Sequence, residues 1–445
     1  MAFWGNFYTT QTRTRLQIFG ILPYSTQKFP TKITGNFSEH IRESSANNRE
    51  FTNILKNITY YNSLDFTHKY TNMRQTKGLS VQKEIFFFSN PFGYGPTATM
   101  IALLRRFSNL KNIKIYVIAN GLCAEILDKT SNITIINIDQ RDVTKIKALL
   151  QKYKKPYVIS SLNRFAILAA KELGLPSCFV DTLTYLWKEI PEDYLKADIY
   201  YASDFPNVYN KTKHYKNAFV TPLIIDSKID ITRTGQNKEG ILLQLGGMKS
   251  PMNDEIPNDY LDIIALGLEN ATMPITVTGG HDGVSHIKSK IHNKYIECIS
   301  TKKSDYLKLL QKSELLITTP GLNSTMEALY HKVPVNFIMP TNLSQWVNYN
   351  IFKQLDANGI DTTWESILKT DLNISDLSEY EAIIKINTFA KTVKKSEENL
   401  KNFYTYFFKT ICNKPDIKNQ QNLLKKYGTN GAEFIAKDII KKWEL

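Results

Sequence analysis

Cysteine is scarce in this chain of 445 residues, and its spacing is informative. The four cysteines lie far apart, at Cys123, Cys178, Cys298 and Cys412, and none forms a Cys-x-x-Cys pair. Without such pairs, the sequence argues against a zinc site or a redox motif. Cys178 lies in an apolar run, which favours a small buried side chain. A reducing compartment fits this cysteine usage, so we expect a cytoplasmic protein.

Long apolar runs and acidic metal motifs are also missing. No segment approaches the roughly 20 apolar residues that span a bilayer. Residues 1–14 contain Trp4 and Phe7 but not the continuous apolar segment of a secretory signal. Asp-x-Asp does not occur, so the chain lacks the carboxylate pair that could clamp a divalent metal at that spacing. We therefore predict no metal site.

The formal net charge is +14, and the excess is uneven. Residues 1–83 contain 11 Lys and Arg against 4 Asp and Glu. One interpretation is a lysine-rich composition with solvated surfaces; another is attraction to an anionic small molecule, a phospholipid surface or nucleic acid. No aromatic and basic motif accompanies the lysines, so we expect no nucleic acid as a partner. A peripheral membrane contact through residues 1–83 stays open, beside a packing role.

Apolar strand patterns and helical patterns alternate in two successive series. Residues 1–83 are polar, and we interpret them as an extension packed on the first domain. Order begins at Ile85–Phe88, a short apolar run typical of a strand buried on both faces. After this first series, Asp226–Gly240 is polar and typical of a linker. The second series follows from Ile241, and includes a helix expected over Tyr306–Lys312.

These patterns predict an α/β protein with two Rossmann-like domains that face each other across a cleft. The expected parts are an extension over residues 1–83, a first domain over 84–235, a second domain over 236–410, and C-terminal helices over 411–445. In open α/β sheets, ligands bind beyond the carboxyl ends of the strands. The segments that follow the strands therefore hold the candidate binding residues.

Three strands of the second series end in glycines or small residues. The segments after them are Gly246-Gly247, Gly279-Gly280 and residues 319–325. His281 follows the second glycine pair, and from there it could contact the phosphate or the base of a nucleotide. Glycines at these positions would let a ligand approach the backbone closely. We expect the three segments to line one crevice.

The turn over residues 319–325 is the most informative of these segments. Gly321 lets the backbone approach a ligand, and three polar residues can cap the next helix: Asn323, Ser324 and Thr325. Free amides at that helix start, with the helix dipole behind them, form an anion site suited to a diphosphate. Glu327, one turn further, could accept bonds from ribose hydroxyls. The alternative is a plain capped turn with an ordinary first-turn glutamate.

One stretch resembles the donor-binding signature of the GT-B glycosyltransferases, the superfamily of the UDP-glycosyltransferases and MurG-like enzymes. It covers residues 318–352, which read TTPGLNSTMEALYHKVPVNFIMPTNLSQWVNYNIF. The resemblance implies contacts to the diphosphate of a nucleotide sugar by Gly321, Ser324 and Thr325. It also implies contacts to the ribose by Glu327 and to the donor sugar by Gln345, with Asn348 supporting the helix start.

The chain departs from this family pattern on both sides of the expected cleft. Ser344 stands where many members carry Asp, and the His-Gly-Gly that many relatives have at Gly321 lacks its His here. On the acceptor side, many members carry Gly-x-x-Gly-His in the first loop. The corresponding loop of this chain supplies Gly93, Tyr94 and Gly95. Pro96 or Thr97 replaces the His, and neither can act as a general base near neutral pH.

Asp181 is the leading candidate for the missing base. It follows the predicted strand Cys178–Val180, so we expect it at the cleft. The apolar run 183–187 after it could raise its pKa by desolvation. The alternative is that its side chain caps the turn that follows.

The resemblance therefore implies a glycosyltransferase that moves a sugar from a nucleoside diphosphate sugar to an acceptor that the sequence does not identify. It implies no cofactor beyond that co-substrate, stabilisation of the leaving diphosphate without a metal, inversion at the sugar, and terminal helices from Asn413 that cross back to the first domain. Two alternatives stay open: a nucleotide-sugar epimerase of the same fold, and a catalytically inactive nucleotide-sugar binder, which the missing His supports.

Overall fold

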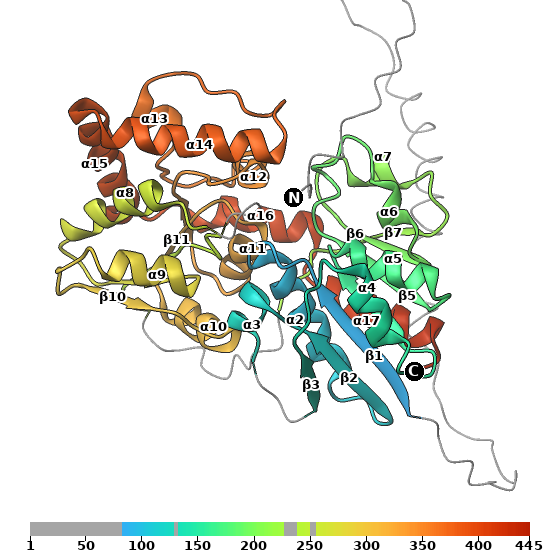
Figure 1. Cartoon of the computed structure of the whole chain (residues 1–445). Coiled ribbons are helices and arrows are strands. Elements are labelled where there is room, and N and C mark those ends of the chain that lie inside the picture. The colour runs from blue at the N-terminus through green and yellow to red at the C-terminus, as the bar shows by residue number, and fades with distance from the viewer. Residues whose placement is uncertain (1–81, 129–131, 227–237, 250–254) are drawn as a thin grey trace, which may run out of the picture. The chain divides into compact units, whose positions relative to one another are not determined.

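The computed structural model describes residues 82–128, 132–226, 238–249 and 255–445. The predicted extension over residues 1–83 lies almost entirely outside them, as does most of the predicted linker Asp226–Gly240. The described chain forms two parallel sheets, with helices between consecutive strands (Figure 1). This confirms the predicted fold class. Among the described residues, no helix combines the length and the apolarity needed to cross a membrane.

The first sheet has seven strands in the order β3-β2-β1-β4-β5-β6-β7, all parallel. The strands are β1 (Lys83–Ser89), β2 (Ile113–Ile118), β3 (Ile133–Ile136), β4 (Tyr157–Ser161), β5 (Ser177–Asp181), β6 (Ile199–Ser203) and β7 (Ala218–Thr221). The helices of this part are α2 (Gly95–Phe107), α3 (Gly121–Ile126), α4 (Val143–Leu150), α5 (Arg164–Glu172), α6 (Glu192–Leu195) and α7 (Val208–Thr212).

Strand β1 is apolar on both faces because helices cover both faces of its sheet. Ile85 and Phe87 lie in one apolar cluster with residues of α2. Phe86 and Phe88 lie in another, with residues of α4 and α5. All four side chains are fully buried. Burial on both faces explains why this run lacks the polar alternation of a half-exposed strand.

The second sheet has five parallel strands in the order β10-β9-β8-β11-β12. The strands are β8 (Ile241–Gln244), β9 (Ile275–Thr278), β10 (Ile296–Ile299), β11 (Leu315–Thr318) and β12 (Val335–Phe337). The helices of this part are α8 (Asn258–Glu269), α9 (His281–Lys288), α10 (Lys303–Lys312), α11 (Leu322–Tyr330) and α12 (Leu343–Gln354). Three more helices follow, α13 (Trp364–Leu368), α14 (Glu379–Lys394) and α15 (Glu397–Cys412), and they join the apolar cluster that contains α8.

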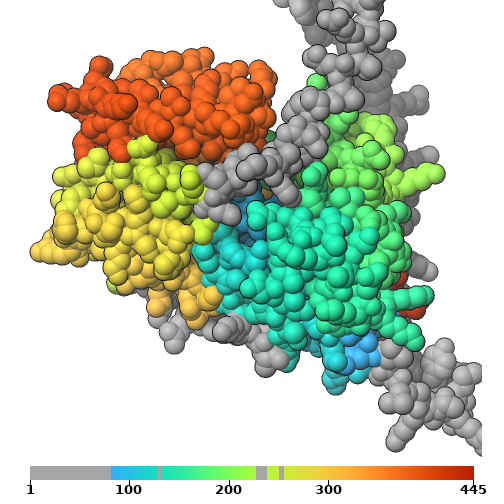
Figure 2. Space-filling view, in the orientation of Figure 1, coloured from blue at the N-terminus to red at the C-terminus, as the bar shows by residue number. Residues whose placement is uncertain are grey.

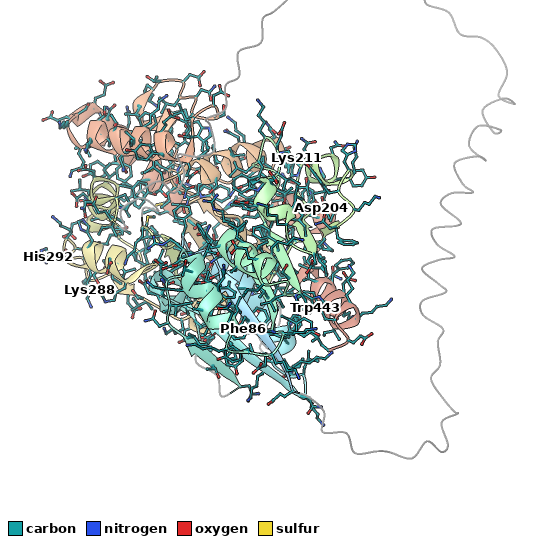
Figure 3. All side chains as sticks on the ribbon, turned by 45° about the vertical axis from the view of Figure 1, so that its right-hand side comes forward. Phe86, Asp204, Lys211, Lys288, His292 and Trp443 are labelled. Carbon is teal, nitrogen blue, oxygen red and sulfur yellow. The ribbon has the colours of Figure 1, made fainter. Side chains whose placement is uncertain are left out.

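Helix α16 (Ile417–Tyr427) packs against α11 and β12, and helix α17 (Gly431–Lys442) returns to the first sheet. Ile435 and Ile439 of α17 lie in the same apolar cluster as Ile85. Trp443 lies at the end of the chain (Figure 3). Its ring is 4.9 Å from the ring of Tyr157, centroid to centroid. The C-terminus is therefore a structural part of the first sheet's core.

One apolar cluster contains residues of both sheets. The Phe205 ring, just after β6, lies 6.2 Å from the ring of Phe352 on α12 and 5.3 Å from that of Tyr427 on α16. The same cluster includes Leu223 after β7 and Phe337 on β12. The two sheets are thus joined by packed side chains and not only by the chain that links them.

Candidate functional site

Each sheet has one point where the strand order reverses, and three predicted site segments follow strands at these points: the Asn90–Thr97 loop, Gly246-Gly247 and residues 319–325. The reversal lies between β1 and β4 in the first sheet and between β8 and β11 in the second. Ligands of open α/β sheets bind at such positions, beyond the carboxyl ends of the strands. In the second sheet, the last residues of β8 and β11 are bonded: Thr318 Oγ1 donates to Gln244 Oε1 at 3.0 Å.

The two glycine pairs of the second sheet lie against each other. The Gly280 amide donates to the Gly246 carbonyl at 2.8 Å, and Gly246 has a φ of +76°. A Cβ added at Gly280 would lie only 2.4 Å from the Gly247 oxygen, and one at Gly247 would lie 3.2 Å from the Gly93 Cα. The structure therefore brings together the predicted glycine segments and the first-domain loop.

The start of α11 differs from the predicted capped turn. Gly321 is the N-cap, so Asn323, Ser324 and Thr325 belong to the first turn instead of capping it. The Thr325 and Ser324 hydroxyls donate to the Gly321 carbonyl, at 2.7 and 3.3 Å. Within the described part of the chain, no side chain caps the first amides of α11. Uncapped amides at a helix start can bind an anion, and for these amides that stays a prediction.

Asn323 joins the two parts of the chain. Its Nδ2 donates to the Gly95 carbonyl and to Thr99 Oγ1, both at 3.0 Å and both on α2. The helix starts of α11 and α2 are thus neighbours, and the loop that ends at Gly95 faces the turn that contains Gly321. A ligand bound at the α11 amides would lie beside the predicted acceptor-side loop.

Glu327 is buried, and its carboxylate is paired. Lys303 Nζ lies 2.6 Å from both carboxylate oxygens, and the two side chains are almost fully buried. Burial raises the pKa of Glu327, while the Lys303 ammonium acts in the opposite direction. The predicted ribose contact would therefore be made by a carboxylate that already binds a cation. Lys303 is the first residue of α10 and precedes the helix predicted over Tyr306–Lys312, so no pattern in the sequence marks it as a partner of Glu327.

Gln345 and Asn348 lie in the first two turns of α12. Asn342 caps this helix by accepting from the Gln345 amide at 2.9 Å. Gln345 Oε1 accepts from the Thr341 amide at 2.8 Å, which orients the carboxamide that is predicted to reach the donor sugar. Asn348 Nδ2 donates to the Pro320 carbonyl at 2.9 Å, so it supports the turn before α11. Ser344 bonds back to Asn342 at 2.9 Å.

Asp181 does not lie open to the cleft, which corrects the expectation for this residue. It is the last residue of β5 and is fully buried. Its oxygens accept from the Leu183 amide at 2.6 Å, Trp187 Nε1 at 2.8 Å and the Tyr200 hydroxyl at 2.6 Å. Burial raises its pKa. This geometry matches the turn-capping alternative, because a carboxylate enclosed by three donors cannot reach an acceptor.

The loop after Asp181 is itself held on both sides. Lys211 of α7 donates to the Tyr185 carbonyl at 2.7 Å and also bonds the Trp187 carbonyl. The Tyr185 hydroxyl donates to Asn348 Oδ1 on α12, in the second domain. The loop after Asp181 therefore contacts α12 directly.

The first-domain loop and His281 converge on a residue that the sequence analysis missed, Glu125 of α3. Gly93 has a φ of +65°, and the hydroxyl of Tyr94, the N-cap of α2, donates to Glu125 Oε2 at 3.0 Å. The backbone amide of His281 donates to the same oxygen at 3.2 Å. The exposed His281 ring bonds Asp282 instead, at 3.2 Å. Nothing in the spacing of Glu125 marks it, because its partners come from distant segments.

Comparison with known proteins establishes the fold. No protein-family model matches the sequence, and no curated protein matches it. MnaA from S. aureus, in a co-structure with UDP, is 14% identical with a TM-score of 0.50, over 82% of this chain and 97% of that chain. Os79 from O. sativa, in complex with UDP, is 12% identical with a TM-score of 0.50, over 80% and 99%. The chain therefore has the GT-B fold that the sequence resemblance implied.

Proposed function

We propose that this protein transfers a glycosyl group from a nucleoside diphosphate sugar to an acceptor. One observation carries the proposal: the uncapped start of α11 follows the reversal point between β8 and β11 and faces the loop that ends at Gly95. Amides at a helix start bind phosphate groups. The GT-B fold alone does not define an activity, so the proposal depends on this site.

The reaction exchanges one bond at the anomeric carbon. A nucleophilic atom of the acceptor forms a bond to that carbon, and the bond to the diphosphate oxygen breaks. The diphosphate leaves with the electron pair, and the acceptor proton passes to a base. The α11 amides and Gly321 would stabilise the charge that develops on the leaving diphosphate, without need of a metal. Inversion at the sugar is part of the proposal, by resemblance to the family.

The leading test is a thermal-shift panel with UDP, GDP and dTDP, each with and without EDTA. A ligand that binds only the folded state raises its stability. We expect at least one of the three to raise the melting temperature equally in both buffers. Glu327→Ala should reduce the shift, because it removes the predicted ribose contact. No shift with any of the three nucleotides would refute the proposal.

A second candidate is a nucleotide-sugar binder without turnover. The enclosed Asp181 favours it, as does the lack of a His in the Asn90–Thr97 loop, because no general base has been identified. The two candidates differ in one measurement. A binder would show the thermal shift but would release no free nucleoside diphosphate from a nucleotide sugar, with or without candidate acceptors.

A further inference from the structure

Lys303 occupies a position that is unfavourable for a lysine without a partner. It is the first residue of α10, where the helix dipole is positive, and it is 5% exposed. Its Nζ lies 2.6 Å from both oxygens of Glu327 and 5.0 Å from the centre of the Tyr306 ring. A buried ammonium needs such compensation. The pair therefore accounts for a lysine at this helix start, and it lies at the residue predicted to bind ribose.

We propose that Lys303 is a positioning residue for the donor: its ammonium keeps the Glu327 carboxylate ionised and oriented as an acceptor for ribose hydroxyls. This inference rests on the proposed function. Each carboxylate oxygen has two lone pairs, so an oxygen that binds Lys303 can still accept a second bond. Burial raises the pKa of Glu327. Loss of the ammonium would favour the protonated carboxyl group, in which one acceptor position becomes a donor.

The other groups that face Glu327 leave this role to Lys303. Arg105 on α2 lies 3.0 Å from Asp226 after β7 and 3.0 Å from Asp128, so these two carboxylates offset its positive charge. Burial raises the pKa of Tyr306 well above its usual range. Burial, with the charges of Lys238 and Lys303, lowers the pKa of His331 to about 4. Tyr306 and His331 are therefore neutral near pH 7, and the ionisation of Glu327 depends on Lys303.

The residues on either side of Lys303 bond residues 124–128, which belong to the first domain. Lys302 Nζ donates to the carbonyls of Ala124 and Glu125 on α3, at 3.0 and 2.8 Å. The Ser304 hydroxyl donates to Asp128 Oδ1 at 2.6 Å. Figure 2 shows the gold atoms of the α10 region against the blue-green atoms of the first domain. These contacts between the two domains thus fix the backbone from which Lys303 reaches Glu327.

The experiment measures UDP affinity by calorimetry at pH 6, 7 and 8. We compare the wild type with K303M, which keeps an unbranched side chain of similar length but no charge, and with K303R, which keeps the charge. Because the terminal phosphate of UDP itself titrates at about pH 6, each variant is compared with the wild type at the same pH. We expect K303R to keep the wild-type affinity at every pH. K303M should bind about 10-fold more weakly at pH 6, the effect of losing a hydrogen bond to a charged group. Its affinity should recover as the pH rises and Glu327 ionises.

A double variant separates positioning from direct contact. In E327Q no carboxylate remains to be held, so K303M/E327Q should bind UDP as well as E327Q alone. An equal loss from K303M in both backgrounds would overturn the inference, as would K303M binding UDP like the wild type or more tightly at every pH. Circular dichroism and unfolding without ligand check that each variant folds.

Two further results keep the test decisive. If K303M does not fold, K303R decides, because an affinity that falls relative to the wild type as the pH is lowered, in a variant that keeps the cation, would contradict the proposed role. A wild type that binds no UDP, GDP or dTDP would refute the proposed function itself, and this inference with it. Wild-type binding with an unaffected K303M would refute the inference alone.

Discussion

At the scale of single residues, Gly280 has no space for a side chain. A Cβ there would lie 2.4 Å from the Gly247 oxygen, which is backbone and cannot rotate away. Gly280→Ala must therefore push apart the segments that follow β8 and β9. We expect it to lower the free energy of unfolding by about 1–3 kcal/mol, measured by urea denaturation. Gly95→Ala is the matched control, because a Cβ at Gly95 meets nothing within 4 Å. Equal stability of the two variants would contradict this packing.

Single residues also show where inference from the sequence ends. Glycines after strands point to close backbone approach, and Gly247, Gly279 and Gly280 do make such approaches. The sequence places Asp181 at a strand end correctly, but it does not show that three donors enclose the carboxylate. The partners of Glu327 and Asp181 come from tertiary packing. A local pattern predicts position along the chain far better than it predicts which atoms meet.

At the scale of elements, strands are predicted better than helix starts. The strand at Leu315–Thr318 ends where the apolar run ends, because a strand buried on both faces is apolar throughout. Helix α10 begins three residues before its predicted start at Tyr306, and helix α11 begins at Leu322. The first residues of α10 are polar and carry no helical periodicity. Lys302 and Ser304 at this helix start bond residues 124–128, and such contacts have no signal in a single sequence.

The carboxyl end of α11 predicts a pH dependence of stability. Burial, with the charges of Lys238 and Lys303, lowers the pKa of His331 from 6.5 to about 4. Between these values the unfolded chain binds a proton that the folded chain does not bind. This contribution to stability is complete above pH 6.5 and is lost as the pH falls toward 4. We expect His331→Gln to reduce the fall in the free energy of unfolding over this window. His292→Gln, at an exposed site, should leave it unchanged.

The measurement is denaturant unfolding at several pH values between 4 and 7. Other carboxyl groups titrate in the same window, so the difference between each variant and the wild type is the quantity to compare. The free energy of unfolding could instead fall equally steeply in His331→Gln and in the wild type. That result would show that His331 takes up a proton as readily in the folded chain as in the unfolded chain.

At the scale of the whole molecule, the shared apolar cluster couples the two sheets. Side chains from β5, β6, β11 and β12 lie in this one cluster, together with residues of α16. Separation of the sheets would expose Phe205, Phe352 and Tyr427 to water, which is unfavourable. The contacts of α10 with α3 are polar and lie near the surface, so they are cheaper to break. Closure around a ligand is therefore expected to adjust the polar side of the contact and keep the apolar side packed.

The same cluster predicts that the two sheets unfold together. We expect a single transition in scanning calorimetry of the wild type, with equal calorimetric and van't Hoff enthalpies. Phe205→Ala removes a ring that is 2% exposed and that packs against Phe352 of the second domain. It should lower the free energy of unfolding by about 3–5 kcal/mol. Phe434→Ala, at a side chain that is 43% exposed, is the control and should change little. Two resolved transitions in the wild type would show that the two domains unfold independently. The packing around Phe205 would then contribute little to the stability of either domain.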